Sequence, residues 1–266
     1  MKKPRVGIVG HGVVGKVHHE AFLAANIETV IFDKFVAQYS GSAQAEQINS
    51  CDLVFISVPT PPKSDGSCDV TAVEEVVGWV SRPMCIKSTI PPGTTNRLIA
   101  ESGKQIVFSP EYTGETAFHP HKARLSKDVV AVGGHRDTAE LVVNVYTQVL
   151  GPDPIYIITD AVTVELAKYM ENCFFATKVA FVAQFFLLSQ SFGADFLTMR
   201  EIWVADARVG RSHSTVVGSP GFAGHCLPKD LSAIVFAAKI AGCKPQLLEA
   251  VDAFNQALRD DLVPSR

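Results

Sequence analysis

The segment best suited to chemistry is a cysteine set among glycine, histidine and lysine. It reads Gly221-Phe-Ala-Gly-His-Cys-Leu-Pro-Lys-Asp230, and its thiol belongs to Cys226. Pro228 suits the first position of a helix, so we expect Cys226 to lie just outside a helix N-terminus. The helix dipole, with Lys229 and His225 nearby, would lower the thiol pKa and favour the thiolate. The alternative is a small apolar side chain with a structural role.

Other polar side chains are spaced for acid, base or oxyanion chemistry. Lys168 and Asn172 are four residues apart, so on a helix they share a face where an ammonium and an amide can stabilise an oxyanion. Glu111 and Glu115 follow the fifth expected strand and could act as general acid and base. Asp230 falls in the first turn after the thiol. Each has a simpler alternative. Lys168 and Asn172 could be a solvated surface pair, Glu111 and Glu115 could lie in an exposed acidic loop, and Asp230 could be an acid that the helix dipole stabilises.

A glycine-rich turn follows the first expected strand and opens the first expected helix. It reads Gly10-His11-Gly12-Val13-Val14-Gly15, the dinucleotide-binding pattern in its required context. Gly10 permits the tight turn, Gly12 lets the backbone approach a pyrophosphate, and Gly15 lets helix and strand pack closely. Asp33 ends the second strand, where a carboxylate binds the adenosine ribose hydroxyls and repels a 2′-phosphate. The sequence therefore predicts NAD rather than NADP, although FAD would use the same turn.

Strand and helix patterns alternate over the first part of the chain, which predicts an α/β fold with a Rossmann-like, doubly wound and mostly parallel sheet. Expected strands are 5–9, 28–32, 52–58, 84–87, 105–108, 128–132 and 155–159, and expected helices include 13–25, 70–80 and 137–150. Beyond residue 160 the pattern is helical. We expect one long helix or two in line over 162–192, then helices over 196–204, 228–241 and 246–261. The predicted domains are 1–160, binding the dinucleotide, and 161–266, all helical.

Bulk composition narrows the class of protein. The net charge of -3, without basic clusters, argues against nucleic acid, and the six cysteines form no C-x-x-C pair that would indicate a zinc cluster or a disulfide framework. Residues 1–9 lack the pattern of a secretory signal, so we expect a cytoplasmic protein. The apolar segment 173–192 carries Lys178, Gln184 and Gln190, which favours a core or subunit-contact helix over a membrane span.

Seven ordered motifs resemble the nucleotide-sugar 6-dehydrogenases, the family that includes UDP-glucose 6-dehydrogenase and GDP-mannose 6-dehydrogenase. They are Gly10-x-Gly-x-x-Gly, Ser57-Val-Pro-Thr-Pro61, Lys87-Ser-Thr-Ile-Pro-Pro-Gly-Thr-Thr95, Ser109-Pro-Glu, Glu165-x-x-Lys168-x-x-x-Asn172, Asp206-x-Arg208-Val-Gly and Gly221-Phe-Ala-Gly-His-Cys-Leu-Pro-Lys-Asp230. The resemblance implies that a sugar primary alcohol becomes a carboxylate while two NAD molecules are reduced. Cys226 would capture the intermediate aldehyde and carry the thioester. UDP-glucose is the expected substrate.

The resemblance also assigns roles to individual residues. Lys168 and Asn172 match oxyanion-stabilising positions, Asp230 and Thr89 match residues that hold a water for proton transfer, and Glu115 matches the acid/base of thioester hydrolysis. Thr60 and Thr89 would contact the cofactor. Arg208 would reach the substrate of a neighbouring subunit. The residues expected to contact the substrate are Glu111, Glu115, Lys168, Asn172, Arg208 and Gly221. The long helix is similar to the family's dimerisation helix, so a homodimer is expected.

The chain differs from the family pattern in three ways, and two other functions remain open. The second nucleotide-binding-like domain that grips the nucleotide would begin where this chain ends, so the resemblance is to a short form. Ala223 replaces a usual glycine, and Ala183-Gln184 replaces a usual Asn-Glu. One alternative is a two-electron hydroxyacid dehydrogenase, which needs no thiol. The other is a non-catalytic NAD-binding remnant, which would have no need of Cys226.

Overall fold

A seven-stranded sheet organises the first part of the protein. The computed structural model describes residues 3–113, 124–216, 218 and 220–260. The strands are β1 (Val6–Val9), β2 (Thr29–Phe32), β3 (Leu53–Ile56), β4 (Met84–Ile86), β5 (Ile106–Phe108), β6 (Val129–Gly134) and β7 (Ile155–Thr159). Their order is β2-β1-β3-β4-β5-β6-β7. The α/β architecture is confirmed, with one exception to parallel pairing, because β6 runs antiparallel to β5.

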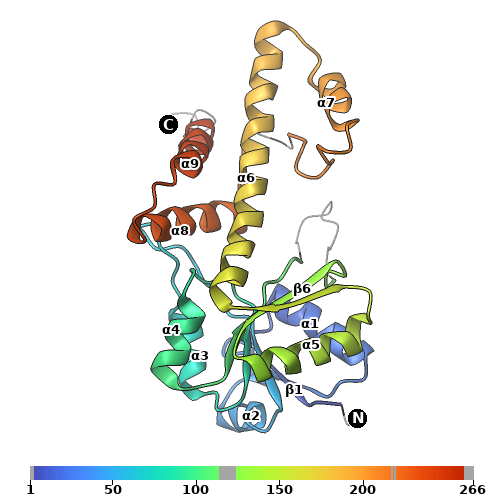
Figure 1. Cartoon of the computed structure of the whole chain (residues 1–266), viewed down its shortest axis with the longest axis vertical. Helices are drawn as coiled ribbons and strands as arrows, with labels where there is room; N and C mark the ends of the chain where they lie inside the picture. The colour runs from blue at the N-terminus through green and yellow to red at the C-terminus, as the bar shows by residue number, and fades with distance from the viewer. Residues whose placement is uncertain (1–2, 114–123, 217, 219, 261–266) are drawn as a thin grey trace. The chain divides into compact units, whose positions relative to one another are not determined.

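Helices cover both faces of this sheet (Figure 1). They are α1 (Val13–Ala24), α2 (Ser42–Ile48), α3 (Thr71–Trp79), α4 (Thr94–Ser102) and α5 (Arg136–Leu150), with a short 3-10 turn at Ala37–Tyr39. Successive strand side chains point to opposite faces, so Val54 and Ile56 pack in one buried cluster with α3 and α4. Leu53 and Phe55 pack in the other with α1 and α5. Both faces being buried explains why these strands are apolar runs without alternation.

The later part is helical, as expected. It contains α6 (Ala161–Phe192), α7 (Phe196–Val204), α8 (Cys226–Ile240) and α9 (Gln246–Asp260). The segment predicted as one helix or two in line is one helix. Cys173, Ala176 and Ala180 on α6 pack in a buried cluster with Leu231 of α8 and Val251 of α9.

Contacts divide the chain into two compact units. The first comprises residues 1–61 and 69–168, and the second comprises 62–68 and 169–266. The division therefore falls inside α6 rather than before it. Residues 62–68 form a small loop with an antiparallel bridge between Pro62 and Cys68, and they group with the second unit.

Three features differ from the sequence-based expectations. Helix α8 begins at Cys226, two residues before Pro228, so the thiol sits in the first turn rather than outside it. Proline is tolerated there because the first amides of a helix have no intrahelical acceptor. Helices α2 and α4 were not expected from the sequence, since both are short and carry many polar residues.

Among the described residues, α6 is the one helix long and apolar enough to cross a membrane by length and composition. The same test is passed by core helices of soluble proteins. Lys168 and Asn172 are buried polar residues on α6, which suits a helix of a globular protein better than a lipid-exposed one.

Candidate active site

The glycine-rich turn between β1 and α1 has the shape that a dinucleotide requires. A Cβ on Gly10 would lie 2.4 Å from the Ser57 carbonyl oxygen, and one on Gly15 would lie 2.0 Å from the Gly10 carbonyl oxygen. Both positions therefore exclude any side chain. A Cβ on Gly12 would meet nothing within 4 Å, so the backbone there is open to a ligand. Val13 and Val14 begin α1, where free amides and the dipole favour phosphate.

Asp33 lies directly after β2 and is tied to the same turn. Its Oδ2 accepts a hydrogen bond from the His11 amide at 2.8 Å, and its Oδ1 accepts one from the Phe35 amide at 2.9 Å. Each oxygen keeps lone pairs for ribose hydroxyls. The turn and Asp33 thus fit NAD in both shape and charge.

Two predicted cofactor residues meet beyond the carboxyl ends of β3 and β4. The Thr60 hydroxyl donates to the Thr89 carbonyl oxygen at 2.9 Å, and the neighbouring Ser88 hydroxyl donates to the Val58 carbonyl oxygen at 2.7 Å. These bonds fasten two loops at the edge of the sheet where α/β proteins bind ligands.

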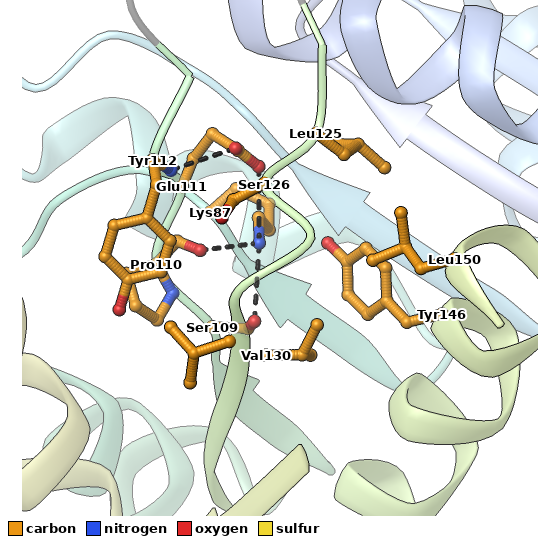
Figure 2. Close-up of a pocket in the computed structure, with 11 residues that line it drawn as sticks. Lys87, Ser109, Pro110, Glu111, Tyr112, Leu125, Ser126, Val130, Tyr146 and Leu150 are labelled. Carbon is orange, nitrogen blue, oxygen red and sulfur yellow. Dashed lines mark hydrogen bonds and ion pairs between the residues drawn. The ribbon is translucent and has the colours of Figure 1, made fainter. Parts of the chain in front are cut away.

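The side chain of Glu111 is only 8% exposed, and its carboxylate binds the segment that follows it (Figure 2). Oε1 accepts from the Tyr112 amide at 2.9 Å, the Thr113 amide at 3.0 Å and the Thr113 hydroxyl at 2.9 Å. Oε2 lies 3.7 Å from Nζ of Lys87. Burial alone raises the pKa of Glu111, but the positive charge of Lys87 and these hydrogen bonds outweigh burial and lower it. The exposed acidic loop considered from sequence is therefore wrong for Glu111. Glu115 lies outside the described residues.

Lys168 is buried in the first unit, with Nζ 4.8 Å from the centre of the Tyr112 ring. This is a cation–π distance. The solvated surface position considered from the sequence is therefore wrong for Lys168. Its ammonium lies next to Tyr112, the residue after Glu111.

Glu165, one turn before Lys168, caps helix α4. Its Oε2 accepts from the Gly93 amide at 2.6 Å, and its Oε1 accepts from the amide and hydroxyl of Thr95 at 2.9 and 2.6 Å. Burial raises the pKa of Glu165, and the bonds from Thr95 and Gly93 oppose that rise. The glutamate of the Glu165-x-x-Lys168 pattern thus fastens the start of α6 to the segment after β4.

In the second unit, Cys226 is exposed at the first position of α8. The helix gives the thiol an N-terminal dipole, the setting in which thiolates form. Cys243 is the other exposed cysteine, whereas burial raises the pKa of Cys173 to about 12, with a further contribution from Asp230. Cys226 is thus a chemically accessible thiol at a helix N-terminus.

Asp230 is buried one turn after the thiol and holds two donors. Nδ2 of Asn172 donates to Oδ2 at 2.5 Å, and Nζ of Lys229 pairs with Oδ1. Two residues predicted from distant motifs are therefore in direct contact.

The loop that leads to the thiol is clamped by α9. Asn255, buried in that helix, accepts from the Phe222 amide at 2.7 Å and donates to the Phe222 carbonyl oxygen at 3.0 Å. Gly221 has φ +98°, and a Cβ there would lie 2.7 Å from Oδ1 of Asn255. Gly221 is thus required by the loop conformation, whatever its role in substrate binding.

Arg208 is exposed and held by its own loop. Its guanidinium makes a forked contact with Asp206, with Nη2 2.6 Å from Oδ2, and this pairing lowers the pKa of Asp206. The Asp206-x-Arg208 pattern therefore presents a pre-oriented guanidinium on the surface.

Three site features were not predicted from the sequence: the cap by Glu165, the clamp by Asn255, and the buried His18–Tyr146 pair beside Glu111. A polar Asn255 on the apolar stripe formed with Val251 and Leu258 is a usable signal. His18 and Tyr146 leave no such signal, because they meet across 128 residues. In the described part of the chain, no group of three or more His, Cys, Asp or Glu side chains is arranged to hold a metal.

Comparison with known proteins gives a consistent assignment. Residues 36–150 match the NAD binding domain of the UDP-glucose/GDP-mannose dehydrogenase family, and residues 162–257 match its central domain. The UDP-glucose 6-dehydrogenase of Rickettsia bellii is 30% identical over 235 residues, which cover 84% of this chain and 52% of that protein. The chain thus spans about half the length of the curated relatives it matches.

Solved structures agree with the sequence matches. A UDP-glucose dehydrogenase from Pyrobaculum islandicum superposes with a TM-score of 0.81 at 26% identity, over 96% of this chain and 68% of that one. A 3-hydroxyisobutyrate dehydrogenase of Mycobacterium tuberculosis has a TM-score of 0.74 at 17% identity, over 98% of this chain and 95% of that one, which shows a shared fold alone. The matched NAD binding and central domains show that this chain belongs to the UDP-glucose/GDP-mannose dehydrogenase family and that its cofactor is NAD.

Proposed function

We propose that the protein oxidises the 6-hydroxymethyl group of a nucleotide sugar to a carboxylate, with UDP-glucose as the first substrate to test. The observation that carries this proposal is the exposed thiol of Cys226 at the N-terminus of α8, one turn before the buried Asp230–Asn172 pair. A two-electron dehydrogenase has no use for such a thiol.

NAD would be held by the Gly10–Gly15 turn, with Asp33 on the adenosine ribose and Thr60 and Thr89 at the adjoining edge of the sheet. When bound, it supplies the oxidising capacity, one molecule for each of two two-electron oxidations. Asp33 would disfavour a 2′-phosphate by charge.

The chain's own residues then act on the sugar. After the alcohol is oxidised, the Cys226 sulfur adds to the aldehyde carbon, and the adduct is a thiohemiacetal. Oxidation of that adduct gives a thioester. Addition of water to the thioester carbon releases the carboxylate and returns the thiol, so four electrons leave the sugar in all.

Charge and proton handling fall to the buried polar groups. Lys168 and Asn172 would stabilise the alkoxide of the addition steps, and Asp230 with Thr89 would hold the water used in proton transfer. Glu115 would serve as acid/base in thioester hydrolysis, and Glu111 would position the segment that leads to it. Gly221 keeps the loop before Cys226 in its conformation.

We further propose a homodimer, formed through α6 and α7. Both helices expose large apolar side chains, among them Phe192 on α6 and Ile202 on α7 at 82% and 72% exposure, and Ile202 also lines an apolar groove with Phe181 and Phe185. Exposed apolar surface of this kind is typical of a subunit contact. Arg208 would then be offered to the substrate of the second subunit.

One assay separates the three functions. The full chain is incubated with NAD and a panel of UDP and GDP sugars, and NADH formed per sugar consumed is counted. Two NADH per sugar supports the proposal. One NADH per sugar, with activity retained in Cys226→Ser, would show a two-electron dehydrogenase. No turnover with NAD bound would show a binding protein.

Cysteine variants provide the matched control. Cys226→Ser should lose nearly all acid product, whereas Cys243→Ser, which removes the other exposed thiol, should retain it. Equal loss in both variants would argue against a specific role of Cys226.

A further inference from the structure

Four polar side chains from four elements meet in the interior of the first unit. His18 comes from α1, Lys87 follows β4, Glu111 follows β5, and Tyr146 lies on α5. His18, Lys87 and Tyr146 are buried, and the charged side chains of Lys87 and Glu111 are only 2% and 8% exposed. Burying charged side chains costs free energy unless they are paired and hydrogen-bonded. The partners of Lys87 and Glu111 therefore restrict both side chains to one geometry.

The tautomer of His18 follows from its partners. Nδ1 lies 2.9 Å from the Val14 carbonyl oxygen, which can only accept, so Nδ1 carries the hydrogen. Nε2 lies 2.7 Å from the Tyr146 hydroxyl. Burial lowers the pKa of His18 to about 4, although Glu111 opposes the shift, so the ring is neutral at neutral pH. Tyr146 therefore donates and Nε2 accepts.

The imidazole nitrogen that accepts from Tyr146 also faces Glu111. Oε2 of Glu111 lies 3.4 Å from Nε2 of His18, and because both atoms only accept hydrogen bonds this is a packing contact. The favourable charge comes from Lys87, whose Nζ lies 3.7 Å from Oε2. Lys87 is itself fixed by the Pro110 carbonyl oxygen at 2.9 Å and the Ser109 hydroxyl at 3.3 Å (Figure 2). Because Oε1 of Glu111 binds the amides of Tyr112 and Thr113, holding the carboxylate holds that segment.

The other ring nitrogen, Nδ1, bonds to the backbone of the cofactor turn. Val14 lies in the first turn of α1, inside the Gly10–Gly15 pattern, and His18 is on the next turn of the same helix. One side chain thus connects the backbone that would receive the pyrophosphate with the carboxylate that orders residues 111–113. Its ring is kept in place by Phe22 and Phe55, with ring centres 5.7 Å away in both cases.

We propose that His18 is a positioning residue that couples occupation of the cofactor site to the order of residues 111–113, through Val14 on one side and Glu111 with Tyr146 on the other. The inference rests on the proposed function in that residues 111–113 are taken to border the site of oxidation. It assigns no contact between His18 and substrate.

Amide-resolved hydrogen exchange on the full chain, with and without saturating NAD, tests the coupling directly. NAD should slow exchange of the Tyr112 and Thr113 amides by about tenfold in the wild type, a typical coupling between sites. His18→Phe keeps an aromatic ring but offers no acceptor to Tyr146 and no donor to Val14, so the slowing should fall below about twofold. His18→Gln, which keeps a polar group, should restore part of it.

A core variant outside the cluster is the matched control. Val142→Ala, on α5 and fully buried, should lower stability and keep the NAD-dependent slowing. Equal slowing in wild type and His18→Phe, or no slowing in the wild type, overturns the proposal, and His18→Gln decides the matter if His18→Phe fails to fold. The measurement needs no sugar, so intact coupling without turnover would refute the proposed function instead.

Discussion

The side-chain amide of Asn172 on α6 donates a hydrogen bond to the carboxylate of Asp230 on α8, across 2.5 Å. The same carboxylate pairs with Lys229, so one buried group satisfies an amide and an ammonium. Removing the carboxylate leaves both donors unpaired.

Asp230→Ala should therefore lower the free energy of unfolding by about 2–4 kcal/mol, the range for breaking a buried charged partnership. Asp230→Asn keeps an acceptor for Asn172 and should cost less. Denaturant unfolding measures both. Asp252→Ala on α9, whose carboxylate pairs with Gln256 at the surface, is the control and should stay near wild type. Equal costs for Asp230→Ala and Asp252→Ala would contradict the role of the buried carboxylate.

His18 predicts a specific pH dependence of stability. Its pKa is about 4 in the folded protein against 6.5 for a free imidazole, because burial disfavours the charged ring. The unfolded chain thus binds a proton first as pH falls. Stability from this group is complete above about pH 6.5 and is lost between about pH 6.5 and 4, by about 3 kcal/mol in all.

His18→Gln, uncharged at every pH, should lack this loss. The measurement is urea unfolding at steps from pH 7.5 to 4 for both proteins, on the order of half a unit apart. Parallel curves would show that His18 does not remain neutral in the folded state.

The clamp by Asn255 predicts a link between α9 and the thiol loop. Asn255→Leu keeps the volume but leaves the Phe222 amide and carbonyl group unpaired, which should cost about 2–4 kcal/mol of stability. The loop should also loosen, so alkylation of Cys226 by iodoacetamide should change its rate and pH profile. Gln256→Ala, at the exposed neighbouring position, should leave both unchanged. A stability loss with an unaltered alkylation profile would confine Asn255 to packing.

The glycine turn predicts that two similar substitutions have opposite outcomes. Gly15→Ala places a methyl group 2.0 Å from the Gly10 carbonyl oxygen and should destabilise the fold. Gly12→Ala meets no protein atom within 4 Å, so stability should stay within about 0.5 kcal/mol of wild type while NAD affinity falls. Thermal unfolding and calorimetric NAD titration distinguish them. Unaltered NAD binding in Gly12→Ala would place the pyrophosphate elsewhere.

The homodimer is tested by adding a charge to the exposed apolar face of α7. Ile202→Arg should convert the dimer to a monomer by light scattering, because a buried unpaired charge is costly at an interface. Leu247→Arg, at a 67% exposed apolar position on α9, is the control and should leave the mass unchanged. A wild-type monomer would refute the proposal.

Local patterns predicted the fold well, and non-local contacts account for what was missed. The strands and the long α6 follow from apolar runs and helical periodicity, which each segment carries by itself. Helix α4 was not predicted, because its N-terminus is capped by Glu165, which lies 70 residues away from Thr95 in the sequence. The Gly10–Gly15 turn and Cys226 were found because motif and local context coincide. The burial of the Glu111 side chain was not predicted, since it depends on contacts with His18 and Lys87, which lie on other elements.

Residues 62–68 group with the second unit, so the two compact units do not correspond to two continuous segments of the chain. Ser232 of α8 donates a hydrogen bond to the Gly66 carbonyl oxygen at 3.1 Å, so α8 rests on a loop encoded far upstream of it. Cutting the coding sequence within α6 would give two fragments, and the downstream one would lack part of its own packing. Separately expressed halves should therefore be less stable than the same segments within the intact polypeptide, and limited proteolysis should not release the second unit as a complete body.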